Sequence, residues 1–344
     1  MEQGILELHP GLVWGFGIVV IIMLLLDLGV FNKKAHEVST KEATIWTVIW
    51  ISLAMVFSGV VYWVFNQDAG GHELALEKFT QFQAAYWIEK ALSVDNLFVF
   101  ILVFGFFKVP KYLHHKVLFW GIIGALIFRA IFIFVGVEVI NYTYLNPILI
   151  FFGLSALPFN INLVMTGFGL FLVYAGIKSW GGGDEEDEED FSNTAGAKLI
   201  KKFWKTTENY EGDKFFIVKN GVKMATPLLV VVAVIEFTDV LFAVDSIPAI
   251  FAISKDPFIL YTSNIFAILG LRSLYFLLAN FMHMFSQLPK GLAFILAFIG
   301  VKMLISPWYH IPSPISLGIV GGVLILSVIA SLIIRKKEEN RNIA

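Results

Sequence analysis

The chain has 344 residues, of which 58% are hydrophobic and 15% charged, and a net charge of −2 at pH 7. In soluble proteins roughly a quarter of all residues are charged, so this composition predicts an integral membrane protein. The net charge gives no sign of nucleic-acid binding. The absence of cysteine excludes disulfides, thiolate metal sites and cysteine nucleophiles.

Long apolar stretches recur along the chain. A bilayer core of about 30 Å needs roughly 20 apolar residues per helix. The first stretch follows two acidic residues and no basic one, so we predict a retained helix and not a cleaved signal peptide. In chain order, the nine predicted spans cover residues 11–31, 43–65, 84–107, 117–140, 161–179, 227–252, 257–281, 291–305 and 315–334.

A further apolar stretch, Tyr144–Phe159, is short and interrupted by Pro147 and Pro158. We predict a re-entrant or interfacial segment here. The alternatives are a tenth span or one long, kinked fifth helix.

The distribution of basic residues predicts the orientation. With nine spans and the N-terminus outside, nineteen of the Lys and Arg residues fall in inner segments and two, Lys78 and Lys255, in outer ones. Because basic residues concentrate on the cytoplasmic side, the C-terminus is expected in the cytoplasm of a bacterial inner membrane protein.

One long loop, residues 181–226, separates the two groups of spans. It contains the acidic run Asp184–Asp190 and then a basic, aromatic stretch, 201–205, suited to an anionic membrane surface. Its composition predicts a solvated cytoplasmic linker, with a regulatory metal-sensing role as the alternative.

Spans three to five resemble spans six to eight. The segment I-E-K-A-L-S-V-D-N at 88–96 aligns with T-D-V-L-F-A-V-D-S at 238–246, which places Glu89 opposite Asp239 and Asp95 opposite Asp245. Arg129 and Arg272 match in the next spans, as do the motifs Gly176-Ile-Lys178 and Gly300-Val-Lys302. Because spans three and six run in opposite directions, we predict inverted 3+3 repeats with a binding site between them.

This organisation predicts an all-α polytopic protein with five parts. They are an N-terminal two-helix unit (1–82), a first repeat (83–180) with an insertion near 144–159, the linker (181–226), a second repeat (227–306) and a C-terminal helix with a cytoplasmic tail (307–344).

Five carboxylates fall inside the third and sixth predicted spans. An ionised carboxylate at a helix centre costs about 2.5–3.5 kcal/mol, so these groups must pair, protonate or bind a cation. The predicted metal-site residues are Glu89, Asp95, Asn96, Glu236, Asp239, Asp245 and Ser246. The predicted charge partners are Lys90, Arg129, Arg272 and Lys302, and a purely structural role for these pairs is the alternative.

Helix geometry constrains this site. At 100° per residue Glu236 and Asp239 share a face, whereas Asp245 points away from Glu236. Pro248 cannot donate to the carbonyl of Val244, so we predict a helix break there that frees an oxygen beside Asp245.

The predicted ligands are all oxygen atoms, which suits a hard divalent cation such as Mg²⁺, Ca²⁺ or Mn²⁺. All seven histidines lie in loops or near span ends, so zinc and copper fit less well. Clustered carboxylates also share protons, which is compatible with proton coupling.

Six stretches of the chain resemble the signature motifs of the TerC/Alx family of integral membrane proteins. The resemblance rests on Glu89–Asn96, Glu236–Pro248, Asp27–Phe31, Phe128-Arg129, Gly176–Lys178 and Leu271–Phe276. It implies a manganese exporter distantly akin to LysE-type transporters, with the five acids handling the metal. Tyr144–Phe159 departs from the repeat, since the second half has no counterpart.

The leading hypothesis is therefore a secondary transporter that exports Mn²⁺ by alternating access. The alternatives are export of Ca²⁺ or Mg²⁺, and a non-transporting membrane scaffold for metal sensing or tellurite stress. No catalytic or cofactor motif is found, so we expect no enzyme and no prosthetic group. The expected partners are the divalent ion, the bilayer and a proton as counter-ion, and the sequence identifies no protein partner.

Overall fold

The computed structural model describes residues 9–31, 39–152, 155, 157–159, 161–180, 191–219, 221–281 and 287–343. Within the helices, the side chains of residues 27–31, 94, 95, 98, 244, 245, 280, 281 and 335–343 are outside the described part of the structure.

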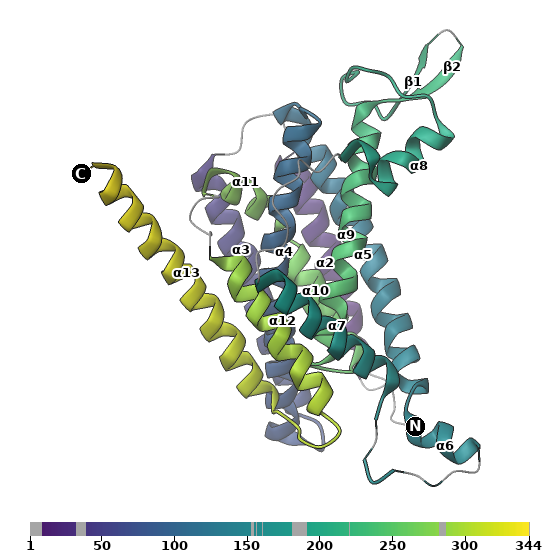
Figure 1. The fold of residues 1–344 in the computed structure, drawn as a ribbon, viewed down its shortest axis with the longest axis vertical. Coiled ribbons are helices and arrows are strands. Elements are labelled where there is room, and N and C mark those ends of the chain that lie inside the picture. Colours follow the sequence, from purple (N-terminus) through teal and green to yellow (C-terminus); the bar gives the residue numbers. More distant parts are fainter. Residues whose placement is uncertain are drawn as a thin grey trace.

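The chain forms a bundle of long helices (Figure 1). The first half contains α2 (Pro10–Phe31), α3 (Thr40–Phe65), α4 (Gly71–Phe106), α5 (Lys111–Tyr142), α6 (Leu145–Phe151) and α7 (Leu163–Trp180). A connecting segment holds η1 (Phe191–Asn193), α8 (Ala195–Phe203), β1 (Phe216–Lys219) and β2 (Val222–Ala225). The second half contains α9 (Pro227–Phe251), α10 (Pro257–Ile268), α11 (Leu271–Phe281), α12 (Leu288–Ile305) and α13 (Ser313–Ile343).

Helices occupy all nine predicted stretches, but fewer meet the criteria for a span. Among the described residues, six helices are long and apolar enough to cross a membrane: α3, α5, α7, α9, α12 and α13 as far as Ile334. The bent pair α10 and α11 makes a seventh if it counts as one span. The central part of α4 carries three charged residues, and the part of α2 with described side chains, Pro10–Leu26, is shorter than 18 residues. Nine spans are therefore not confirmed.

The helices α4, α5, α9 and α10 pack against one another in the centre of the bundle. The aromatic rings of Phe57, Phe82 and Phe266 fix α3, α4 and α10 together, with ring centroids 4.8 to 6.2 Å apart. Such aromatic pairs add to the energy gained by burying the rings. The central helices therefore hold side chains in fixed positions.

The predicted break at Pro248 is wrong, because α9 continues as a helix to Phe251. Pro248 lies in the last turn, where only one helical hydrogen bond is lost. The chain bends instead by 41° between α10 and α11. Gly270 at this bend has φ +87°, a conformation that favours glycine, and a Cβ atom there would lie 2.7 Å from the Trp50 ring.

The segment before α9 packs onto one end of the bundle, the hairpin end. The antiparallel pair β1–β2 corrects the all-α prediction. Tyr210 donates to the carbonyl of Phe107 (2.9 Å), and Lys116 donates to Asp213 (3.0 Å). This ammonium group holds the pKa of Asp213 below its usual value, and burial raises the pKa of Tyr210 to about 12. The predicted acidic run, Asp184–Asp190, lies outside the described residues.

At the opposite end of the bundle, α6 lies beyond the ends of α5 and α7 (Figure 1). A cavity opens at this end, which we call the cavity end. With seven residues α6 is too short to be a tenth span. The chain closes around it, because Leu145 donates to Ile161 and Leu163 donates to Thr143. The predicted insertion is thus a compact excursion from the bundle.

Candidate functional site

A buried carboxylate lies at the centre of the bundle. Glu89, on α4, is 0% exposed and accepts hydrogen bonds from three other residues. Ser93 donates from the next turn of α4 (3.2 Å), Asn264 donates from α10 (3.1 Å), and Arg129 donates from α5. The charged partner and the two further donors offset the cost of burying this carboxylate inside the bundle.

Arg129 connects two of the predicted acids. Its Nη1 atom pairs with Glu89, while Nη2 lies 3.3 Å from Oδ1 of Asp239 on α9. Nη1 also lies 3.4 Å from the amide oxygen of Asn264. The guanidinium group is 1% exposed, so this ion-pair cluster joins α4, α5, α9 and α10 away from water.

The face of α9 next to this cluster is rich in polar atoms without partners. Glu236 Oε2, Asp239 Oδ2 and Ser246 Oγ are buried, and none has a hydrogen-bond partner among the described residues. Such orphaned atoms are costly, since buried polar groups are nearly always satisfied. These atoms are therefore available to a ligand.

Gly124 makes room for the carboxylate of Glu236. A Cβ atom at this position of α5 would overlap all three heavy atoms of the carboxylate group. Glu236 and Asp239 both face α5, as their spacing on α9 predicted.

Two predicted acids, Asp95 and Asp245, lie within α4 and α9, but their side chains are outside the described part of the structure. Asn96 is buried on α4. Among the described residues, no three His, Asp or Glu side chains come together to hold a metal ion. Arg129 thus joins Glu89 and Asp239, Glu236 lies one turn from Asp239, and the metal site itself stays a prediction.

The predicted charge partners differ in their contacts. Lys90 donates to the backbone carbonyl of Ala267 (3.2 Å) and Lys302 to the hydroxyl of Ser316 (2.8 Å). Neither lysine forms an ion pair with a carboxylate among the described residues, and with Asp95 and Asp245 outside them, the expected pairing of these lysines with an acid stays a prediction. Arg272, on α11, is buried.

Sequence reasoning missed Asn264 and Gly124. Asn264 could have been found as a polar residue inside a long apolar stretch. Gly124 carries no such signal, because its role depends on which residue of α9 faces it.

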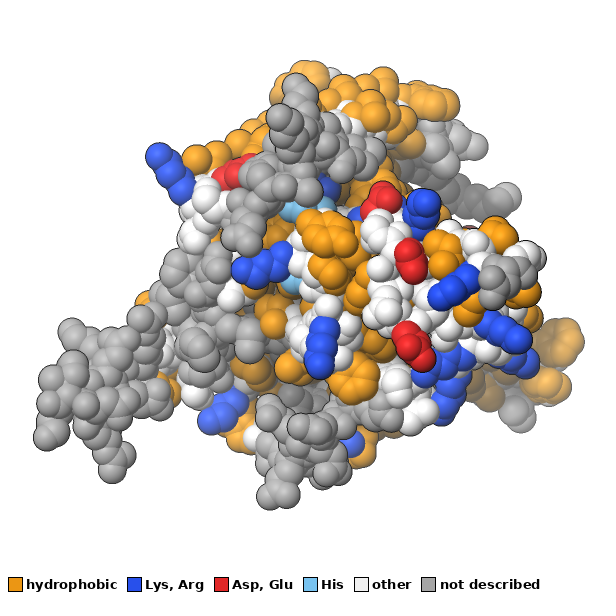
Figure 2. Space-filling view, turned by 90° about the horizontal axis from the view of Figure 1, so that it is seen from above, with side chains coloured by type: hydrophobic (Ala, Val, Ile, Leu, Met, Phe, Trp, Pro, Cys, Tyr) orange, Lys and Arg blue, Asp and Glu red, His pale blue; other side chains and the backbone are white. Residues whose placement is uncertain are grey.

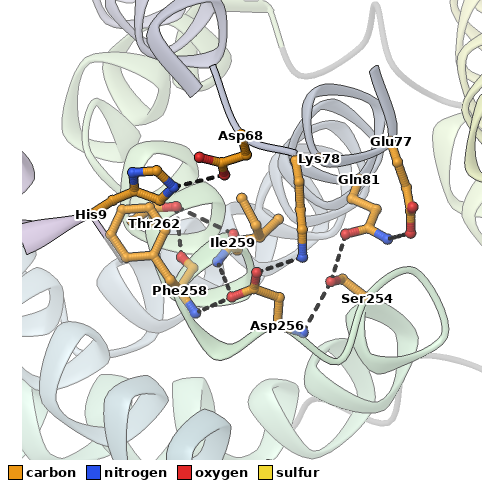
Figure 3. Close-up of polar contacts among 10 residues, drawn as sticks. All are labelled: His9, Asp68, Glu77, Lys78, Gln81, Ser254, Asp256, Phe258, Ile259 and Thr262. Atoms are coloured by element: carbon orange, nitrogen blue, oxygen red, sulfur yellow. Dashed lines mark hydrogen bonds and ion pairs between the residues drawn. The ribbon is translucent and has the colours of Figure 1, made fainter. Parts of the chain in front are cut away.

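A separate cavity of ≈1580 Å³ opens at the cavity end. Figure 3 shows contacts between residues that line it: Lys78 of α4 donates to Asp256 (2.7 Å), and Ser254 donates to Gln81 (2.8 Å). Asp256 also caps α10 by accepting from the N–H of Phe258. Glu89, Arg129 and Asp239 are not among the residues that line this cavity.

Comparison with known proteins identifies the family. Residues 74–339 match the family described as Integral membrane protein TerC. An uncharacterized membrane protein of Myxococcus xanthus is 44% identical over 324 residues, covering 94% of this chain and 92% of its own. Two proteins named as candidate membrane-bound redox modulators, Alx, are each 40% identical. The Salmonella typhi protein matches over 96% of this chain and 97% of its own, and the Escherichia coli K12 protein over 92% and 93%.

No solved structure matches the chain. The family and these relatives are described as membrane proteins or modulators and not as enzymes. The family match and the relatives each cover most of the chain, and the protein belongs to the integral membrane protein TerC family.

Proposed function

We propose that this protein is a secondary transporter that exports Mn²⁺ through a carboxylate site inside the membrane. The observation that carries the proposal is the buried cluster of Glu89, Arg129 and Asp239, with unpartnered oxygens beside it on α9. Ionisable groups at such depth are costly and mark ion pathways. The carboxylate and hydroxyl oxygens suit a hard divalent cation, and the choice of Mn²⁺ rests on the family resemblance.

The packing of α7 against α12 supports the inverted repeat. A Cβ atom at Gly176 would lie 2.6 Å from the carbonyl of Ala293 and 2.7 Å from the nitrogen of Ala297. One at Gly300 would lie 2.7 Å from the carbonyl of Gly169 and 2.7 Å from the nitrogen of Val173.

The two sets of contacts are equivalent when each residue of α7 is matched with the residue of α12 that lies 124 positions later in the sequence. Gly176 corresponds to Gly300, residue 169 to 293, and residue 173 to 297. Contacts that are equivalent in this way are expected of two units related by a two-fold axis. In a transporter, such an axis lies in the membrane plane and relates the two access states.

The charge at the hairpin end supports the proposed orientation. Figure 2 looks onto this end and shows many Lys and Arg side chains with fewer acidic ones among the described residues. We place this end in the cytoplasm of a bacterial inner membrane, with the cavity end outside. The C-terminus is then cytoplasmic and the N-terminus outside. The Lys78–Asp256 and Gln81–Ser254 contacts would close the outer side.

Other functions predict different outcomes. Export of Ca²⁺ or Mg²⁺ would use the same oxygens. A metal-sensing or tellurite-stress scaffold would use the linker and need no transport. The redox role in the names of the Alx relatives cannot involve thiols of this chain, because it has no cysteine.

Transport in proteoliposomes tests the proposal. The purified protein should move Mn²⁺ faster than Ca²⁺, Mg²⁺ or Zn²⁺, and an internal pH dye will report whether protons move in exchange. Glu89→Gln and Asp245→Asn should reduce Mn²⁺ flux at least tenfold. The matched control Glu73→Gln, at the exposed start of α4, should not.

Wild-type flux in Asp245→Asn would exclude this site from transport. Deletion of Asp184–Asp190 tests the scaffold. Loss of cellular function with transport retained would favour sensing over export.

A further inference from the structure

Arg129 occupies the position between carboxylates that a transported cation would need. Its guanidinium group reaches Glu89 of α4 and Asp239 of α9, two helices that belong to different halves of the chain. Both acids are almost fully buried, Glu89 at 0% and Asp239 at 4% exposed. Two opposing carboxylates with one cation between them would also be the first ligands of a divalent ion.

The contacts of Arg129 with the two acids are unequal. Arg129 makes one contact with each acid, but both oxygens of Glu89 accept hydrogen bonds, whereas Asp239 accepts only from Arg129, at 3.3 Å, among the described residues. Arg129 Nε and Asp239 Oδ2 have no partner among the described residues. Arg129 also does not use both prongs of its fork on one carboxylate, which is the geometry of the strongest arginine–carboxylate pairs. The weaker contact, to Asp239, is therefore the one that can open.

A second carboxylate lies beside this weaker contact. Glu236 is one turn from Asp239 on α9 and rests on Gly124, which belongs to the same helix as Arg129. Its Oε2 atom is buried without a partner among the described residues. When the guanidinium leaves Asp239, two carboxylates of α9 become available to an incoming ion.

We infer that Arg129 is a tethered counter-cation, which occupies the site when it is empty and withdraws from Asp239 when a divalent cation binds. This inference rests on the proposed transport function. An arginine is suited to the role because it stays protonated at any physiological pH.

A charge argument explains why a transporter would need this residue. With the metal released and no arginine present, the empty site would hold at least two negative charges in a low-dielectric interior. Such a site would resist the conformational change that returns it to the other side. Arg129 reduces this charge, so the empty protein can complete the cycle.

Net efflux and exchange separate the counter-cation from a structural residue. Net efflux requires the empty site to reorient, whereas exchange of internal for external Mn²⁺ requires only the loaded form. In Arg129→Gln we expect the ratio of net efflux to Mn²⁺ exchange to fall at least tenfold. Mn²⁺ should bind at least tenfold more tightly, because the competitor for Asp239 is gone.

The experiment uses the full chain in proteoliposomes with radioactive Mn²⁺, plus Mn²⁺ titration of the detergent-solubilised protein. Lys116→Gln, which removes a cation at the hairpin end, is the control and should leave both measurements unchanged. If Arg129→Gln does not fold, Arg129→Lys replaces it. Lysine keeps the charge but lacks the fork, so Mn²⁺ should bind at least threefold more tightly than to wild type.

Equal losses of net efflux and exchange in Arg129→Gln would overturn the inference, as would unchanged or weaker Mn²⁺ binding in either variant. The failure of the transport proposal looks different. In that case the wild type itself shows neither Mn²⁺ exchange nor Mn²⁺ binding.

Discussion

Gly124→Ala is the sharpest test of the site, because it should displace one carboxylate with little effect on the fold. The added methyl group would overlap the carboxylate of Glu236. To restore the ~3.5 Å separation of non-bonded atoms, that group must retreat by on the order of 1–2 Å. The obstacle is the flexible end of a side chain, so rotation about its χ angles relieves the clash.

The two contributions to stability nearly cancel. A strained or altered rotamer costs about 0.5–1.5 kcal/mol. Replacing glycine by alanine in a helix gains roughly 1 kcal/mol. The free energy of unfolding should therefore change by less than about 1 kcal/mol. Mn²⁺ flux should nevertheless fall at least tenfold, because a site must be held to within about 0.5 Å.

Gly121→Ala is the matched control. Gly121 lies one turn earlier on α5 and also faces α9, but its new methyl group would meet only Ile235 Cγ2 at 3.2 Å. Thermal unfolding in detergent and Mn²⁺ flux in proteoliposomes should be close to wild type. If folded Gly124→Ala transports Mn²⁺ like Gly121→Ala, the carboxylate of Glu236 has no part in transport.

Three further predictions concern the fold. Asp256→Ala removes the cap of α10 and the partner of Lys78, and should lower the free energy of unfolding by about 1–2 kcal/mol. Asp256→Asn keeps the cap and should lower it by less than half as much. Chemical denaturation in detergent measures both values. Gly300→Ala places a methyl group 2.7 Å from the backbone of α7 and should destabilise by about 1–3 kcal/mol, whereas Gly318→Ala, in open space, should not; equal melting temperatures would contradict the packing described for α7 and α12.

The third concerns pH: because Lys116 lowers the pKa of Asp213 below 3.8, the ion pair persists above that pH and is lost as the pH falls through the lowered pKa. Limited proteolysis of residues 206–226 should therefore increase only in acid, and in Asp213→Asn it should already be fast at pH 7.

Hydropathy predicted the helices well because burial of apolar surface dominates their formation. It located α3, α9 and α12 within a few residues of their observed bounds. It failed at the start of α4, which begins at Gly71 and not at residue 84. There, charged residues reduce hydropathy but do not interrupt helical hydrogen bonds.

The site was less predictable, since it depends on contacts between helices. The repeat alignment selected Glu89 and Asp239, and the structure joins them through Arg129. It could not show that Lys90 binds a backbone carbonyl. Proline was also a poor guide to the break, because the bend between α10 and α11 depends on the positive φ of Gly270.

The close approach of α7 and α12 determines where the bundle can move. Near Gly176 and Gly300 the two backbones touch without side chains between them, so sliding along the helix axes would drive carbonyl groups into neighbouring atoms. Rotation about this contact meets less resistance. If the two halves rotate relative to each other during transport, the rotation axis passes close to the contact between Gly176 and Gly300. Spin labels near residues 173 and 297 would keep a constant separation while labels flanking the cavity move apart.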